Sequence, residues 1–210
     1  SNTSPPKGPI VVIDAGHGGF DPGKVGINDA LEKDVNLSIS IKLKKFLELN
    51  DVTVIMTRSD DNGLYSESDK NKKNADLKKR VAIINDSDAV LAVSIHQNYF
   101  EQESSHGEQI FYHSKSPEGK TLATVIQKQI KQTIKDDNHR VAKSNESYYM
   151  LKKTEITIVI AECGFLSNSR EAALLCSEEY QEKLAWAIHL GVLNFINNPD
   201  GLNDGAKEEE

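Results

Sequence analysis

Hydrophobic residues occur along the chain in two patterns, short continuous runs and longer stretches with helical spacing. Continuous runs are typical of strands buried on both faces, and they predict strands over residues 10–13, 52–57, 89–95, 109–112, 148–151 and 157–161. Between the runs, apolar residues recur every three or four positions and predict helices over residues 33–49, 75–84, 116–136 and 177–196. This alternation predicts an α/β domain: a three-layer, mostly parallel or mixed twisted sheet of about six strands with helices on both faces.

Polar residues mark where several of these helices begin. Ser116 is followed by Pro117, and a proline at the first helical position sacrifices no intrahelical hydrogen bond. Asn168 and Glu171 have the spacing of a capping box. Ser177, followed by two glutamates, favours the start of the last helix because acidic side chains stabilise a helix N-terminus.

The two ends of the chain differ in composition from the rest. Residues 1–9 are a polar leader and residues 198–210 an acidic tail, so we expect both to be disordered and residues 10–197 to form one folded domain. The formal charge is -7, and five acids and one Lys in the last twelve residues account for -4 of it. The total of -7 argues against a nucleic-acid binder, which needs basic surface to displace counterions, while the body alone is near neutrality at -3.

Polar residues follow three of the predicted strands. His17 lies among glycines in the sequence DAGHGG after residues 10–13, and His96 comes directly after residues 89–95. Sheets of this class place their sites at the carboxyl ends of strands. Two imidazoles at one edge have no packing role there, and with one carboxylate they form the ligand set of a catalytic zinc site. Spacing favours Glu32 as the third ligand and leaves three alternatives open: Asp21, Asp29 and Asp34.

Glu162 follows the apolar strand 157–161. A carboxylate in such a place is costly unless it is paired or functional. Glu162 therefore has the profile of a general base with a raised pKa beside the zinc site.

The residues resemble a known family, the zinc-dependent N-acetylmuramoyl-L-alanine amidases (amidase type 3), which cut peptidoglycan. The resemblance runs in family order from about residue 10 to residue 196. The matching segments are VVIDAGHGGFDPG (11–23), LEKDVNLSISIKLKKFLE (31–48), Thr57-Arg58, LKKRVAIIND (77–86), AVLAVSIHQN (89–98), GEQIFYH (107–113) and AECGFLSN (161–168).

The resemblance implies a site and a reaction. His17, Glu32 and His96 would bind one zinc ion, and Glu162 would be the catalytic glutamate. The family cleaves the amide between the lactyl group of N-acetylmuramic acid and the L-alanine of the stem peptide. Zinc would acidify a water molecule, and Glu162 would take its proton and pass it to the leaving amine.

Further residues are assigned by weaker features of the resemblance. Arg140 and the strand 148–151, with its two tyrosines, fall where relatives keep an Arg and aromatic residues near the substrate groove, and Asn98 could also bind substrate. The equally open alternatives are a solvated Arg140, a half-buried strand and an Asn98 that binds a loop carbonyl. Cys163 follows the catalytic glutamate where the family more often has a small residue; we expect a small buried hydrophobe rather than a reactive thiol.

The remaining histidines and the lysine-rich stretch have simpler readings. We expect structural or solvated roles for His106, His113, His139 and His189, with His106 or His139 as alternatives for lining the groove. Residues 70–80 carry five lysines and Arg80, and we expect them to form the solvated side of a loop and short helix because no aromatic platform accompanies them.

The length of one interval points to a branch of the family. Some members carry a long insertion between the second strand and the IHxN block, which covers the zinc, and the interval from Arg58 to Ala75 leaves no room for such a lid. The chain therefore most resembles the spore-cortex (CwlD-type) branch, in which cleavage precedes muramic-δ-lactam formation. This implies extracytoplasmic action, in the cell wall or the forespore intermembrane space, by an exported or membrane-anchored protein. It also implies a partner protein that supports zinc binding or activity.

Two other functions remain as alternatives. A zinc peptidase of related fold would cut peptide bonds of the wall instead of the muramyl amide. A non-catalytic wall-binding module would retain a vestigial site, which the joint presence of three ligands and Glu162 disfavours.

Overall fold

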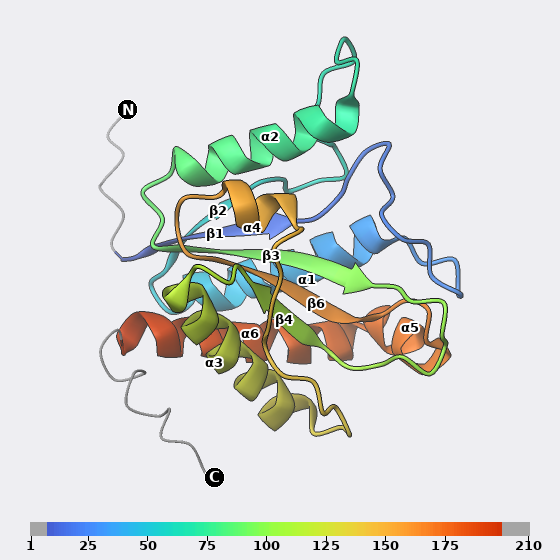
Figure 1. Ribbon diagram of the computed structural model, residues 1–210. Coiled ribbons are helices and arrows are strands. Elements are labelled where there is room, and N and C mark those ends of the chain that lie inside the picture. The colour runs from blue at the N-terminus through green and yellow to red at the C-terminus, as the bar shows by residue number, and fades with distance from the viewer. Residues whose placement is uncertain (1–7, 199–210) are drawn as a thin grey trace.

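The computed structural model describes residues 8–198 and has a six-stranded sheet between two layers of helices (Figure 1). The strands are β1 (Ile10–Ala15), β2 (Thr53–Met56), β3 (Leu91–Asn98), β4 (Gln109–Tyr112), β5 (Lys143–Ser144) and β6 (Ile158–Phe165). They lie in the order β2-β1-β3-β6-β4-β5, with the first four parallel, β4 antiparallel to β6, and β5 parallel to β4. The predicted mixed sheet is confirmed.

Two hydrophobic cores hold the helices to the sheet. The helices are α1 (Glu32–Glu48), α2 (Lys72–Asn85), α3 (Pro117–Ile134), α4 (Tyr149–Lys153), α5 (Ser169–Leu175) and α6 (Glu178–Asn197). The larger core joins α1, α3 and α6 to one face, and the smaller core joins α2 and α4 to the other. Figure 1 shows α2 and α4 on one side of the strands and α1 and α6 on the opposite side.

The predicted helix starts agree with the capping hydrogen bonds. Ser116 Oγ accepts from the Gly119 amide, and Asn168 Oδ1 accepts from the Glu171 amide. The Glu171 carboxylate does not complete a capping box, because it accepts from the amides of Gly107 and Phe165 instead. That side chain therefore ties the loop before β4 to the end of β6.

The strand predicted over residues 148–151 is wrong, since this segment belongs to α4. Asn145 Oδ1 accepts from the amides of Ser147 and Tyr148 and turns the chain before the helix. Met150 and Leu151 are neighbours in sequence and both pack in the smaller core, whereas a strand would direct them to opposite sides. The sheet still has six strands, because β5, a pair of exposed residues beside β4, takes the place of the strand predicted over residues 148–151.

The regular elements run from Ile10 to Asn197. Of the predicted leader and tail, only Gly8, Pro9 and Asn198 are among the described residues, and the Pro9 carbonyl accepts from the Thr53 amide at the start of β2. Within residues 8–198, no helix combines the length and apolar character that crossing a bilayer requires.

Candidate active site

Strand alternation directs the polar residues at the carboxyl edge of the sheet toward the face that α2 and α4 cover. On β3, Ala92 packs in the smaller core, and His96, four residues later, points the same way. On β6, Ile158 and Ile160 pack in that core and Glu162 continues their row. The register of β3 and β6 pairs His96 with Glu162, so a predicted ligand and the predicted base lie on neighbouring strands.

His17 follows β1 with a left-handed backbone, at φ 64°. Its Nδ1 lies 2.8 Å from Asp21 Oδ2, and its Nε2 lies 3.2 Å from Glu32 Oε1. Burial alone lowers the pKa of His17, but the hydrogen bonds with Asp21 and Glu32 outweigh it and raise this pKa to about 9. A carboxylate behind one ring nitrogen is the usual way to orient a metal-binding histidine, so Asp21 directs Nε2 toward Glu32.

Glu32 is the first residue of α1 and brings the two imidazoles together. Its Oε1 lies 3.2 Å from His17 Nε2 and 3.0 Å from His96 Nδ1, while its Oε2 accepts from the Lys24 amide. Burial opposes ionisation, but the two histidines hold the pKa of Glu32 well below its usual range. Ligand atoms of these three residues all lie within 4.8 Å of one another.

The other three carboxylates near the first helix do not join the two histidines. Asp21 lies behind His17, and Asp29 and Asp34 are exposed. Glu32 is therefore the carboxylate that completes the set, as the family resemblance implies.

The three side chains and their surroundings fit a zinc ion. Two imidazoles and one carboxylate are the protein ligands of many catalytic zinc sites. Two glycines leave the room that these ligands occupy: a Cβ on Gly16 would lie 2.3 Å from His96 Cε1, and a Cβ on Gly23 would lie 2.5 Å from Glu32 Oε2. The backbone is thus shaped around the ligand set.

Glu162 is 6% exposed and lines a pocket of about 420 Å³ together with the three ligands. The Tyr148 hydroxyl donates to its Oε1 at 3.1 Å, and its buried Oε2 has no hydrogen-bond partner within residues 8–198. Burial raises the pKa of Glu162, as expected for a carboxyl group in an apolar strand. Cys163 points into the larger core with no exposure, where burial raises the pKa of its thiol, so it is the small buried hydrophobe that the sequence favoured.

The two residues predicted to bind substrate are placed differently. Asn98 lines the same pocket, and its Oδ1 accepts from the Tyr99 amide. Arg140 does not line it; its guanidinium stacks 4.7 Å from the centre of the Phe165 ring and donates to Gln109 Oε1. Gln109 pairs with Glu162 across β4 and β6. Arg140 therefore lies beside the pocket and is connected to Glu162 only through Gln109.

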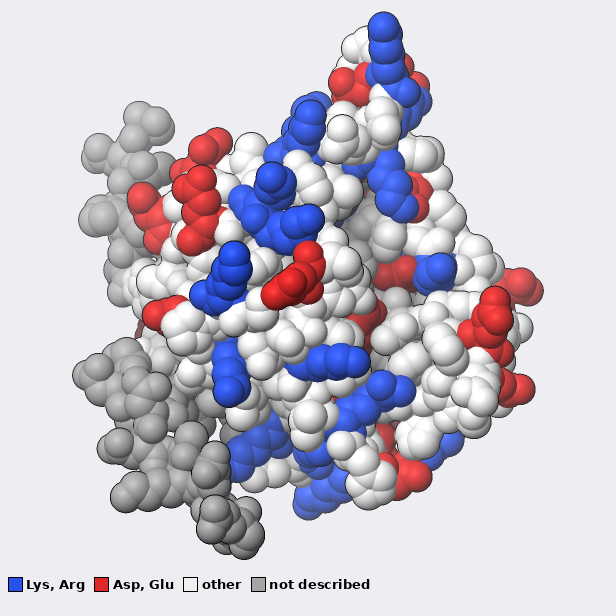
Figure 2. All heavy atoms as spheres, in the orientation of Figure 1, with Lys and Arg blue, Asp and Glu red and all other residues white. Residues whose placement is uncertain are grey.

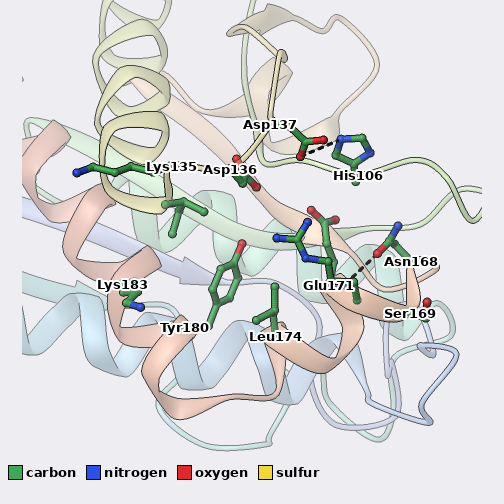
Figure 3. Close-up of a pocket in the computed structure, with 12 residues that line it drawn as sticks. His106, Lys135, Asp136, Asp137, Asn168, Ser169, Glu171, Leu174, Tyr180 and Lys183 are labelled. Carbon is green, nitrogen blue, oxygen red and sulfur yellow. Dashed lines mark hydrogen bonds and ion pairs between the residues drawn. The ribbon is translucent and has the colours of Figure 1, made fainter.

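The other four histidines do not line the pocket that holds His17, Glu32 and His96. His106 lines a second pocket of about 390 Å³ between α3, α5 and α6, with its Nε2 3.7 Å from Asp137 Oδ1 (Figure 3). His113 is partly buried and His139 is exposed. His189 is buried, and its Nε2 lies 2.9 Å from Asn50 Nδ2. The alternative that His106 or His139 lines the metal groove is therefore not supported.

One residue of the lysine-rich stretch contradicts the expectation of a solvated face. Lys78 and Lys79 are exposed, but Arg80 is 1% exposed. Its Nη1 donates to Asp14 Oδ1 at 2.8 Å and its Nε to Asp76 Oδ2 at 2.5 Å, so two carboxylates balance the buried charge. Asp14 inside an apolar strand was the available signal, because a buried carboxylate requires such a partner.

Two further contacts near the site were not predicted from the sequence. The Tyr148 hydroxyl reaches Glu162 from α4, and Arg58, 4% exposed, donates to the carbonyls of Ala15 and Gly16. Lys and Arg side chains spread over the face formed by α2, α4 and α3 (Figure 2). This face is more basic than the total charge suggests.

Comparisons with known proteins agree with the geometry. Residues 11–194 match the family described as N-acetylmuramoyl-L-alanine amidase. The germination-specific N-acetylmuramoyl-L-alanine amidase of Bacillus subtilis is 37% identical over 195 residues, which cover 91% of this chain and 81% of that protein.

Solved structures show the same fold. The CwlD amidase from Clostridioides difficile, in complex with the GerS lipoprotein, is 42% identical with a TM-score of 0.88, over 90% of this chain and 99% of that chain. The catalytic domain of CwlV from Bacillus (Paenibacillus) polymyxa var. colistinus is 30% identical with a TM-score of 0.79, over 90% and 98%. With matching sequence, fold and ordered site residues, the chain belongs to the N-acetylmuramoyl-L-alanine amidase family and resembles its CwlD-type branch.

Proposed function

We propose that the protein is a zinc-dependent hydrolase of peptidoglycan, which cleaves the amide between the lactyl group of N-acetylmuramic acid and the L-alanine of the stem peptide. The observation that carries this proposal is the convergence of His17, Glu32 and His96 on one point, in a pocket that also holds Glu162. Membership of the amidase family supports the choice of bond.

The side chains can divide the chemistry among them. A zinc ion held by His17, Glu32 and His96 would act as a Lewis acid that polarises the scissile carbonyl and acidifies a water molecule. Glu162 Oε2 has no partner among the residues that the structure describes, so it is free to take a proton from water and to deliver it to the nitrogen of the leaving L-alanine. The Tyr148 hydroxyl fixes the other oxygen of the same carboxylate.

The test combines metal analysis with one substitution. We expect the purified protein to bind one zinc ion per chain, and Glu162→Gln to keep that zinc while activity on muropeptides falls by about 10²- to 10⁴-fold. Glu155→Gln, which changes an exposed carboxylate just before the same strand, is the matched control. Unchanged activity of Glu162→Gln would refute the proposed role.

The products separate the amidase from the two alternatives. An amidase releases a stem peptide with a free L-alanine amino terminus and leaves an unsubstituted lactyl group, whereas a zinc peptidase leaves L-alanine attached to muramic acid. A wall-binding module would release neither product. Mass spectrometry of a muropeptide digest with and without added zinc distinguishes the three.

Substrate contacts are proposed for two residues at different distances from the metal. Asn98 lines the pocket and can present its amide group to a bound stem peptide. Arg140 can act on the peptide only beyond the pocket, at the end of β6 where it stacks on Phe165. If both bind substrate, alanine at either position raises KM with little change in zinc content.

A role in spore-cortex maturation, before muramic-δ-lactam formation, is supported by the similarity to a germination-specific amidase. Relatives include proteins named as cell wall amidases, which supports extracytoplasmic action on the wall. Lys24 and Lys73, which line the pocket, suit a substrate whose stem peptides carry carboxylates. Loss of muramic-δ-lactam from spores of a deletion strain would support this role, and its presence at normal levels would contradict it.

A protein partner that supports zinc binding or activity is also proposed. The CwlD amidase of C. difficile has been solved in complex with a lipoprotein, and between Met56 and Lys72 the described chain forms turns and bends without a helix that could cover the pocket. Full zinc occupancy and full activity of the isolated chain would count against this dependence.

A further inference from the structure

Two buried arginines bind the backbone of the loop that carries His17. Arg58 Nε donates to the carbonyl of Ala15 at 2.8 Å, and its Nη2 donates to the carbonyl of Gly16 at 3.0 Å. Arg80 Nη1 donates to the carbonyl of Ala15 at 2.6 Å, and its Nη2 to that of His17 at 2.5 Å. We propose that Arg58 and Arg80 are positioning residues, which set the loop so that the His17 ring is in place before the metal binds.

The loop needs such support because its backbone is unfavourable. His17 has φ 64°, and Gly18 and Gly19 follow with φ 135° and 60°. A left-handed conformation disfavours a residue with a Cβ, and three successive positive φ angles prevent a regular hydrogen-bond pattern for the carbonyls before them. The guanidinium groups supply the donors that the backbone lacks.

Arg58 also links the loop to the helix that carries Glu32. The same Nη2 that donates to Gly16 donates to the carbonyl of Lys33 at 2.7 Å, one residue after Glu32. One planar group thus contacts the two segments that supply His17 and Glu32, and it fixes the spacing between them. A rigid fork of donors suits this role because its hydrogen bonds keep a defined geometry.

Arg80 is fixed from the other side. Asp14 Oδ1 and Asp76 Oδ2 accept from it, so its position is determined by β1 and by its own helix, α2. Figure 1 shows α2 lying along the sheet beside β1, which allows a side chain of α2 to reach the end of that strand. Neither arginine lines the metal pocket, so both act through the backbone of the ligand loop.

This inference rests on the proposed zinc site, and zinc affinity of the folded protein tests it. Lysine at position 80 keeps the charge and most of the buried stem but offers no planar fork. We expect Arg80→Lys to weaken zinc binding by about 10- to 100-fold in a chelator competition, the usual cost of disturbing the support of a ligand. Because zinc stabilises only the folded state, the rise of Tm on adding zinc should shrink in the same variant.

A matched control separates positioning from general stability. Tyr180→Phe removes a buried hydrogen bond to Glu108 Oε1 between α6 and the residue before β4, and it has no contact with the ligand loop. We expect this variant to lower the Tm of the metal-free protein and to keep the zinc affinity of the wild type. If Arg80→Lys does not fold, Arg58→Lys takes its place.

The outcomes are distinct. A folded arginine variant that binds zinc as tightly as the wild type would overturn the positioning role and leave the proposed function intact. Equal losses of affinity in Tyr180→Phe would also overturn it. A wild type that binds no zinc would refute the metal assignment itself, and the inference with it.

Discussion

Of the two glycines beside the predicted ligands, Gly16 leaves less room for a side chain than Gly23. A Cβ there would lie 2.3 Å from Cε1, 2.4 Å from Nε2 and 2.8 Å from Nδ1 of His96. Contacts of 3.4 Å and more are ordinary, so in Gly16→Ala the imidazole must move by about 1 Å. The φ angle of Gly16 lies outside the left-handed range, so the substitution acts through this contact rather than through backbone strain.

A displacement of that size is large for a metal ligand, because zinc–nitrogen bonds are about 2.0–2.1 Å long. We expect the zinc affinity of Gly16→Ala to fall by about 10- to 100-fold. Misplacement of a reacting group by about 1 Å can cost about 100-fold in rate, so we expect kcat/KM to fall by at least this factor. This loss corresponds to about 3 kcal/mol of transition-state stabilisation.

Chelator competition and initial rates of muropeptide cleavage at saturating zinc measure the two effects. Gly26→Ala is the matched control, since its Cβ meets the flexible end of Asn28 at 2.8 Å and no other atom closer than 3.4 Å. The control should bind zinc and turn over as the wild type does. Wild-type zinc affinity in Gly16→Ala would refute either the role of His96 as a ligand or the close approach of its ring.

Three shorter predictions concern groups around the site. Burial raises the pKa of Asp14, but Arg80 and the hydroxyls of Ser94 and Thr57 outweigh this effect and lower the pKa from 3.8 to about 2. This depressed pKa contributes about 2 kcal/mol to the free energy of unfolding, which is present above pH 4 and lost as the pH falls through 2. In urea titrations between pH 5 and pH 2, the free energy of unfolding of Asp14→Asn should therefore depend less on pH than that of the wild type. An equal dependence would contradict the pairing of Asp14 with Arg80. Tyr148→Phe removes a hydrogen bond that lowers the pKa of Glu162, so the acid limb of the kcat/KM profile should move to higher pH, and an unmoved limb would show that this contact does not act in catalysis. Cys163→Ala should cost about 1 kcal/mol of unfolding free energy by urea titration and leave kcat/KM unchanged; loss of activity would mean that the thiol takes part in the chemistry.

Local patterns were sufficient for most of the fold. The runs of β1, β3 and β6 are apolar on both faces, and Ser116 with Pro117, Asn168 and Ser177 marked three helix starts, because caps and buried strands are determined by residues close in sequence. The strand predicted over residues 148–151 was wrong because the conformation of this segment depends on contacts outside it. Its tyrosines favour a strand, but the turn made by Asn145 and the shared core of Met150 and Leu151 require a helix.

The site divides in the same way. His17, His96 and Glu162 could be selected because they follow strands that the sequence makes plain, and the family resemblance distinguished Glu32 from its neighbours. Arg80 could not be placed by its surroundings in sequence, which are lysines. Its burial depends on Asp14, 66 residues away, and such a pairing exists only once the chain has folded.

The pocket is built from two separate parts of the chain, one of which includes the short helix α4. The predicted metal ligands come from the ends of β1 and β3 and the start of α1, whereas Tyr148, Tyr149 and Met150 form a wall from a separate segment between β5 and β6. That segment is held by a few core side chains and is flanked by surface turns. It can therefore change in length and sequence while the segments that carry His17, Glu32 and His96 stay the same. Substrate preference can therefore diverge among relatives while Glu162 and its partner Tyr148 stay the same, and chimaeras that exchange residues 149–156 and leave Tyr148 in place would transfer the one without the other.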